Sequence, residues 1–167
     1  MKPFRPAFTR DPIAGIAECH VRIRTYCEGL QRLVALPSLN DPRVPSAAAQ
    51  AFRYFSIGLP LHAEDEDVSF APRLLRLAPE LAAVFDRLSR EHQSIESQLA
   101  GLLPRLSVLA KGNIDDPEAL RANANALCGT LLPHIAFEET AFFPACSRLQ
   151  SADLAEISIE MAERRST

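Results

Sequence analysis

Four histidines constrain this chain more than any other feature of its 167 residues. Each lies in a different segment in which apolar residues recur every three or four positions, the spacing of an amphipathic helix. The four are His20, His62, His92 and His134, and each takes a place in the apolar stripe of its segment. A lone buried histidine usually has its own hydrogen-bond partner, but each unpaired buried group costs about 1–3 kcal/mol. Four such residues on four helices therefore predict a shared partner, such as a metal ion.

The first two helical segments have recognisable ends. Asp11, followed by a proline, predicts the start of the first helix, and Pro37 predicts its end. The second helix is expected to begin with Ser46 as its N-cap. Because Pro60 removes a backbone donor, this helix should kink just before His62.

The remaining helices follow from the same signals. The third is predicted from about Pro79 to Lys111, with Gly112 as its C-cap. The fourth should begin after Asp116, which is followed by a proline and a glutamate in the first turn. A short amphipathic helix is expected over about 151–164.

Composition supports a single helical domain. Glycine is scarce and 47% of the residues are apolar, which is ordinary for a globular protein with a real core. We expect one all-α domain over residues 1–167. It consists of an antiparallel four-helix bundle over about 11–149 and the short C-terminal helix.

The charge and cysteine patterns exclude several classes of protein. The net charge is −3 and the basic residues are scattered, which argues against binding to nucleic acid. No apolar run approaches the length of a membrane span, and the charged start does not resemble a signal peptide. The four cysteines form no CxxC pair, so we expect reduced core thiols in a cytoplasmic protein.

His62 and His134 are each followed by a glutamate after four residues. His62 precedes Glu66 and His134 precedes Glu138, and a four-residue step returns to within about 40° of the same helix face. A buried carboxylate is costly unless it is paired, and one glutamate can bridge two cations with its two oxygens. Four imidazoles and two bridging carboxylates therefore predict a dinuclear site.

The donor set also indicates which metal the site prefers. Mixed imidazole and carboxylate ligands without thiolate favour non-haem iron, with zinc or manganese as alternatives. We expect two iron ions joined by an oxo or hydroxo bridge. Coordination positions would remain open for a small ligand such as O2, NO or peroxide.

Four stretches of the sequence resemble the ligand-bearing helices of the hemerythrin-like family, whose members carry HHE cation-binding domains. They are DPIAGIAECHVRIR, LPLHAEDEDVSFAP, LSREHQSIESQL and LLPHIAFEETAFFPACSRL. The resemblance spans about residues 10–150 and implies a hemerythrin-like bundle. It also implies a pairing of ligands, in which His20 and His62 serve one iron, His92 and His134 serve the other, and Glu66 and Glu138 bridge.

The chain departs from the oxygen-carrying members at three positions. Those proteins have a further histidine where this chain has Glu96, which puts reversible oxygen carriage in doubt. Glu96 would be an extra oxygen ligand, a partner of a ligand, or an ordinary helix carboxylate. Ala63 stands where related proteins often have a second histidine. The oxygen carriers place the last bridging carboxylate at the position of Glu139, whereas helical spacing from His134 favours Glu138.

The acidic run over residues 64–67, near the end of the predicted second helix, is a less specific signal. Glu64 and Asp67 are expected to be solvated, and Asp65 is left open. No separate acid, base or nucleophile pattern supports turnover, so whether the chain is an enzyme stays undecided. The leading expectation is a di-iron protein that binds or senses O2, NO or peroxide, or handles iron. The alternative is a bundle held together by zinc or iron that acts through a protein partner or as a homodimer.

Overall fold

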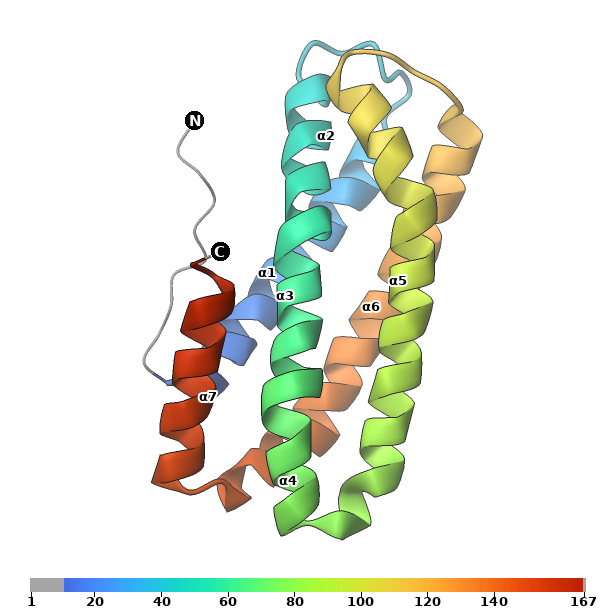
Figure 1. Cartoon of the computed structure of the whole chain (residues 1–167). Helices are drawn as coiled ribbons and strands as arrows, with labels where there is room; N and C mark the ends of the chain where they lie inside the picture. The colour runs from blue at the N-terminus through green and yellow to red at the C-terminus, as the bar shows by residue number, and fades with distance from the viewer. Residues whose placement is uncertain (1–10, 167) are drawn as a thin grey trace.

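The computed structural model describes residues 11–166, which are helical and contain no strand. The main helices are α1 (Pro12–Val34), α2 (Val44–Arg53), α3 (Leu59–Glu64), α4 (Ala71–Leu77), α5 (Ala82–Ala110), α6 (Pro117–Ala145) and α7 (Ser151–Arg164). Four helical rods form the bundle: α1 is the first, the continuous run from α2 to α4 is the second, α5 is the third and α6 is the fourth. The last helix, α7, lies outside the bundle (Figure 1).

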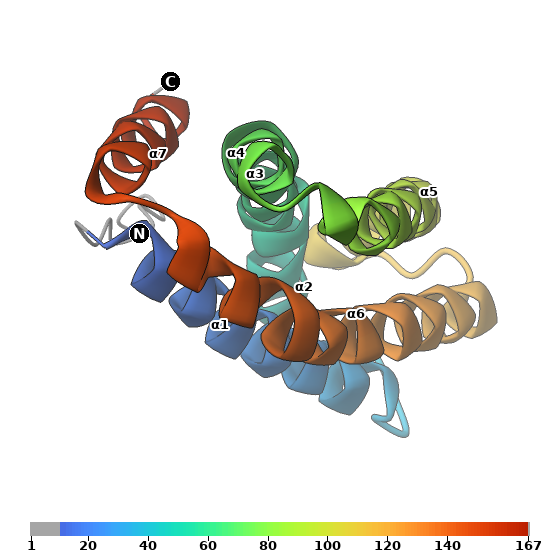
Figure 2. The same cartoon turned by 90° about the horizontal axis from the view of Figure 1, so that it is seen from below.

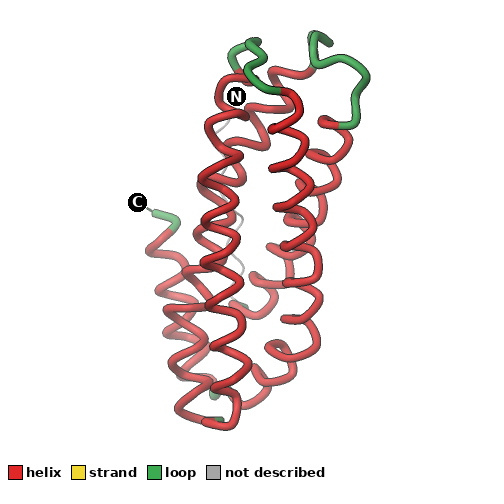
Figure 3. The backbone as a smooth tube through the Cα atoms, turned by 90° about the vertical axis from the view of Figure 1, so that its right-hand side faces the viewer, coloured by secondary structure: helices red, strands yellow, loops and turns green. Residues whose placement is uncertain are grey.

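The rods run up and down in turn, so neighbours in sequence are antiparallel (Figure 1). α1 packs against α2 and α6, and α5 packs against the same two helices, which closes a ring of four. Seen from below, α7 lies beside α1 and α4, outside this ring (Figure 2). The loops gather at the two ends of the rods (Figure 3). The predicted all-α antiparallel bundle is confirmed.

The second rod is one uninterrupted helix over residues 44–77 that contains two π-helical turns. The first turn, η1, spans Tyr54–Gly58 and ends where the Leu59 N–H donates to the Tyr54 carbonyl, five residues back. This turn directly precedes Pro60, and the rod continues through that proline although its nitrogen cannot donate a hydrogen bond. The predicted kink itself stays a prediction. The second turn, η2, spans Asp65–Phe70. The helix thus continues through the acidic run instead of ending there.

The predicted N-cap of the second rod is wrong. The helix begins at Val44 with Arg43 at the N-cap position and no side-chain cap, so Ser46 lies within the first turn. Pro45 explains the shift, because proline is favoured in the first helical turn, where its missing N–H costs nothing.

The predicted N-caps Asp11 and Asp116 are confirmed, whereas the C-cap of α5 is Lys111, one residue before the predicted Gly112. Asp11 accepts a hydrogen bond from the backbone of Ile13 at 2.9 Å, and Asp116 accepts one from Ala119 at 3.0 Å. Gly112 has a φ of 78°, which only glycine adopts at little cost.

The third rod differs slightly from its predicted bounds. Its first residues, Pro79–Leu81, form a 3₁₀ turn, and the α-helix begins at Ala82 and ends at Ala110. The C-terminal helix spans Ser151–Arg164, as predicted.

The apolar core is divided into two clusters. One centres on residues such as Ile23, Phe55 and Leu102, and the other on residues such as Phe70 and Phe142. The four histidines lie between them along the rods. Among residues 11–166, no helix combines the length and apolar character needed to span a membrane.

Candidate metal centre

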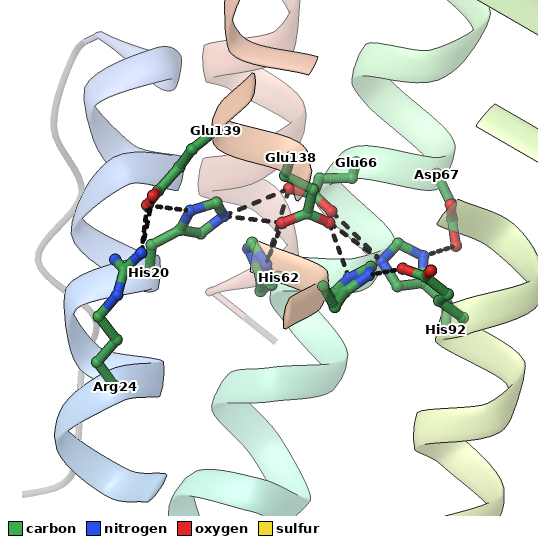
Figure 4. A network of polar contacts seen from close by, with 10 residues as sticks. His20, Arg24, His62, Glu66, Asp67, His92, Glu138 and Glu139 are labelled. Atoms are coloured by element: carbon green, nitrogen blue, oxygen red, sulfur yellow. Dashed lines mark hydrogen bonds and ion pairs between the residues drawn. The ribbon is translucent and has the colours of Figure 1, made fainter. Parts of the chain in front are cut away.

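The structure brings the four histidines together at one level of the bundle. They come from α1, α3, α5 and α6, one from each rod, and their rings face a common point where Glu66 and Glu138 also lie (Figure 4). His20 and His62 are each 1% exposed and His134 is 2% exposed. All six side chains predicted to bind metal therefore meet in one buried cluster.

The two glutamates lie between the histidines. Glu138 approaches His20 Nε2 at 3.0 Å and His134 Nε2 at 2.8 Å. Glu66 approaches His92 Nε2 at 3.4 Å and His62 Nε2 at 3.7 Å. One oxygen of each carboxylate faces one histidine pair, and the other oxygen faces the second pair.

These contacts define two overlapping groups of potential ligand atoms. Within each group the atoms lie within 4.8 Å of one another. The first group is His20, His62, Glu66 and Glu138, and the second is Glu66, His92, His134 and Glu138. Because both glutamates belong to both groups, two cations bound there would share these carboxylates.

The inner atoms are buried without hydrogen bonds. Within the described part of the chain, this holds for the Nε2 atoms of all four histidines and for all four oxygens of Glu66 and Glu138. Their separations are short, but none has the geometry of a hydrogen bond. Unpaired polar atoms that converge from every side are costly unless a cation lies among them. The residues present therefore fit a metal pair.

The proton balance of the cluster leads to the same conclusion. Burial lowers the pKa of His62 to about 3, so its imidazole is neutral and can offer a lone pair. Burial, followed by the charge of Glu138, raises the pKa of Glu66 well above its usual value. Burial lowers the pKa of His92, but its carboxylate neighbours, with Asp67 first, outweigh this and raise it to about 12. A proton on His92 thus supplies positive charge that a bound cation would replace.

Three of the histidines, His20, His134 and His92, have a carboxylate partner on Nδ1, the ring nitrogen on the outer side of the cluster. Nδ1 of His20 lies 3.1 Å from Glu139, which Arg24 also binds at 2.7 Å. Nδ1 of His134 lies 2.7 Å from Glu91. An ionised carboxylate only accepts, so the facing Nδ1 donates and the Nε2 lone pair points inward.

The other outer contacts differ from one another. Nδ1 of His92 lies 2.9 Å from Asp67, whereas Nδ1 of His62 is buried without a hydrogen bond. Arg87 donates to Glu91 at 2.7 Å and stacks over the Phe137 ring at 3.6 Å. The hydrogen bond from Arg87 holds Glu91 beside His134.

Sequence reasoning missed this outer layer, although the sequence contains a signal for it. Glu91 precedes His92, Asp67 follows Glu66, and Glu139 follows Glu138, so each outer carboxylate is next to an inner residue. Adjacent positions on a helix point about 100° apart. Each outer carboxylate therefore turns toward a histidine on a neighbouring helix.

The structure also places the residues that the sequence left open. Glu138 is fully buried in the inner cluster, while Glu139 lies outside it against Arg24. Glu96 is exposed beside a cavity. Asp67 is not simply solvated, because it contacts His92 while staying 42% exposed. Asp65 is completely buried.

A cavity of about 310 Å³ adjoins the cluster between the second rod and α5. His62, His92 and His134 line it together with Ala63 and Glu96. His20 does not line it, and its ring instead stacks on Phe143 at 5.0 Å between ring centres. The centre is therefore open on one side and closed on the other.

Comparison with known proteins agrees with this geometry. An uncharacterised protein of Haemophilus influenzae is 25% identical over 170 residues, which covers 99% of this chain and 96% of that protein. The hemerythrin HHE cation binding domain matches residues 11–146, a range that contains all four histidines and both buried glutamates. This chain therefore belongs to the hemerythrin HHE cation-binding domain family.

Proposed function

We propose that the chain is a non-haem di-iron protein whose centre takes up a small ligand such as O2, NO or peroxide. One observation carries the proposal: four inward Nε2 atoms and four carboxylate oxygens are buried together without hydrogen bonds. His20 and His62 would hold one ion and His92 and His134 the other, with Glu66 and Glu138 shared.

The donor chemistry supports iron over a structural zinc. Imidazole and carboxylate together suit iron or manganese, whereas a structural zinc site is usually closed by four ligands of its own. When bound, an iron pair supplies reversible electron transfer and open positions for a small ligand. The chain's own carboxylates accept the Nδ1 protons of His20 and His134, which fixes each tautomer so that the Nε2 lone pair points to the inner side.

The cavity supports uptake of an external ligand. It reaches the histidines from the α5 side, and its walls include the apolar residues Leu59, Leu99 and Leu131. Such walls admit a small neutral molecule and limit the access of water. The four buried free thiols, all within the described residues, fit the reducing cytoplasm expected from the sequence.

Metal analysis of protein purified without oxygen from iron-replete cells tests the proposal. We expect about two iron atoms per chain, and new near-ultraviolet absorption after oxidation. Addition of azide or NO should then change the spectrum of the iron-loaded protein. Recovery of one zinc and no iron would instead favour a metal-stabilised bundle that acts through a partner protein.

A further inference from the structure

The C-terminal helix α7 lies beyond the residues that match the family domain, which end at residue 146. It nevertheless packs against η2, the π-helical turn that carries Glu66. π-helical turns are rare and are often found at functional sites. The contacts between α7 and η2 therefore bear on how the metal centre is held.

Asp65, the first residue of η2, is bound by two arginines at the end of α7. Arg164 Nη1 donates to its Oδ1 at 2.8 Å, and Arg165 Nη1 donates to the same oxygen at 3.2 Å. Arg165 also donates to the second oxygen of Asp65. Asp65 is 0% exposed, so these guanidinium groups compensate a fully buried charge.

Ser69, one turn later, is held from the same helix. Arg164 Nη2 donates to the Ser69 hydroxyl at 2.6 Å, and that hydroxyl donates to Glu160. Arg73 donates to Glu160 at 2.7 Å and to the Ser69 carbonyl at 2.8 Å. α7 thus contacts η2 at both Asp65 and Ser69 through charged groups.

Three consecutive residues of η2 point in three directions. Asp65 faces α7, Glu66 faces the centre, and Asp67 reaches the outer nitrogen of His92 on α5. They share one short backbone segment, so a rotation that released Asp65 would turn the other two away from their positions.

We propose that Asp65, Arg164 and Arg165 are positioning residues for the metal centre. They hold the π-helical turn in the register that directs Glu66 inward and Asp67 to His92. This inference rests on the proposed metal centre. Because coupling between two sites is reciprocal, metal binding and docking of the α7 terminus strengthen each other.

The test compares two ways of loosening α7. In the first, Arg164→Met and Arg165→Met together remove the charges beside η2 but keep apolar side chains of similar length. In the matched control, Arg76→Met removes the 2.7 Å contact with Asp153 in the first turn of α7, an ion pair that involves no residue of η2. Circular dichroism establishes the helix content of each metal-free protein. Each is then titrated with Co²⁺, whose visible absorption reports both affinity and ligand geometry.

We expect the double variant to bind Co²⁺ at least about tenfold more weakly than the parent, the range seen when partners of metal ligands are lost. The Arg76→Met control should stay close to the parent, and Arg164→Lys with Arg165→Lys should recover part of the affinity. If the double variant loses helix, Asp65→Asn serves in its place, with the same loss expected. Equal affinity in the parent and in the variant tested would overturn this inference, whereas a parent that binds no metal would overturn the proposed centre itself.

Discussion

The two sides of the candidate metal centre differ in how they are enclosed. On the α1 side, His20 is 1% exposed, its ring stacks on Phe143, and its outer nitrogen contacts Glu139. On the α5 side, His92 lines a cavity of about 310 Å³, and its outer partner Asp67 is 42% exposed. Both histidines approach the same shared carboxylates.

This difference separates two tasks. On the packed side, ring stacking and an arginine-bound carboxylate orient the His20 ring. The open side leaves room beside His92 for a ligand that enters from the cavity. We therefore expect substitutions at the shared carboxylates to affect both sides, substitutions on the packed side to affect stability, and substitutions on the open side to affect ligand entry.

Loss of a shared carboxylate should have the largest effect. Glu66→Ala and Glu138→Ala each remove an oxygen from both groups, so metal content should fall from about two ions per chain to near zero. Glu139→Ala is the comparison variant, because that residue lies outside the inner cluster against Arg24 and contacts the outer nitrogen of His20, so its loss should weaken metal binding without emptying the centre. Elemental analysis measures the content. The assignment of the bridge is wrong if Glu139→Ala empties the centre and Glu138→Ala does not.

Removal of one histidine on each side should separate metal binding from packing. His20→Ala and His92→Ala should each lose at least one ion, and loss of bound metal costs about 3 kcal/mol when the metal is present at a hundred times its Kd. His20→Ala should also remove the ring that stacks on Phe143. The Tm of this variant should therefore stay below that of the parent even when both proteins have been stripped of metal by a chelator. Calorimetry with and without chelator measures both effects. If the metal-free His20→Ala protein is as stable as the metal-free parent, packing of His20 does not contribute to stability.

Loss of an outer carboxylate should have a smaller effect. Glu91→Gln keeps the shape but removes the charge that faces His134, and we expect metal affinity to fall about 10- to 100-fold. The loss of affinity in Asp67→Asn should lie at the low end of this range, because Asp67 is more exposed than Glu91. Glu96→Gln, on the same helix as Glu91, should change affinity by less than about twofold. Competition titrations against a chelator of known affinity distinguish these values, and an equal loss in all three variants would argue against a specific outer layer.

Narrowing of the cavity should have the smallest effect on the protein and should act on ligand entry alone. Ala63 lines the cavity, so Ala63→Phe should slow the association of azide or NO with the iron-loaded protein several-fold while the iron content stays the same. Val21→Phe is the control, since Val21 is 63% exposed on the helix of His20. Stopped-flow absorbance measures the rates. Identical association rates for Ala63→Phe and the parent would mean that the ligand reaches the centre by another route.

The fold and the inner cluster could largely be predicted because their signals are local. Helical periodicity placed each histidine on an inward face, and a four-residue spacing placed Glu138 beside His134. Caps such as Asp11 and Asp116 act within three residues of their helices, so sequence neighbours suffice to find them. The N-cap of the second rod was misplaced because Pro45 and Ser46 are competing local signals.

The outer layer depends on neighbours distant in sequence. Glu139 meets a histidine 119 positions earlier in the chain, and Arg164 meets Asp65 across 99 positions. Local spacing cannot encode such contacts, because they depend on how far each rod is rotated and shifted against the next.

The sequence by itself thus determined that four helices would each present a histidine inward and that two glutamates would accompany them. Only the tertiary structure decided that one side of the centre is closed and the other open, and that α7 binds the turn beside Glu66. The physical reason is that the face of a helix follows from its own periodicity, whereas enclosure, charge compensation and access arise only where separate helices pack together.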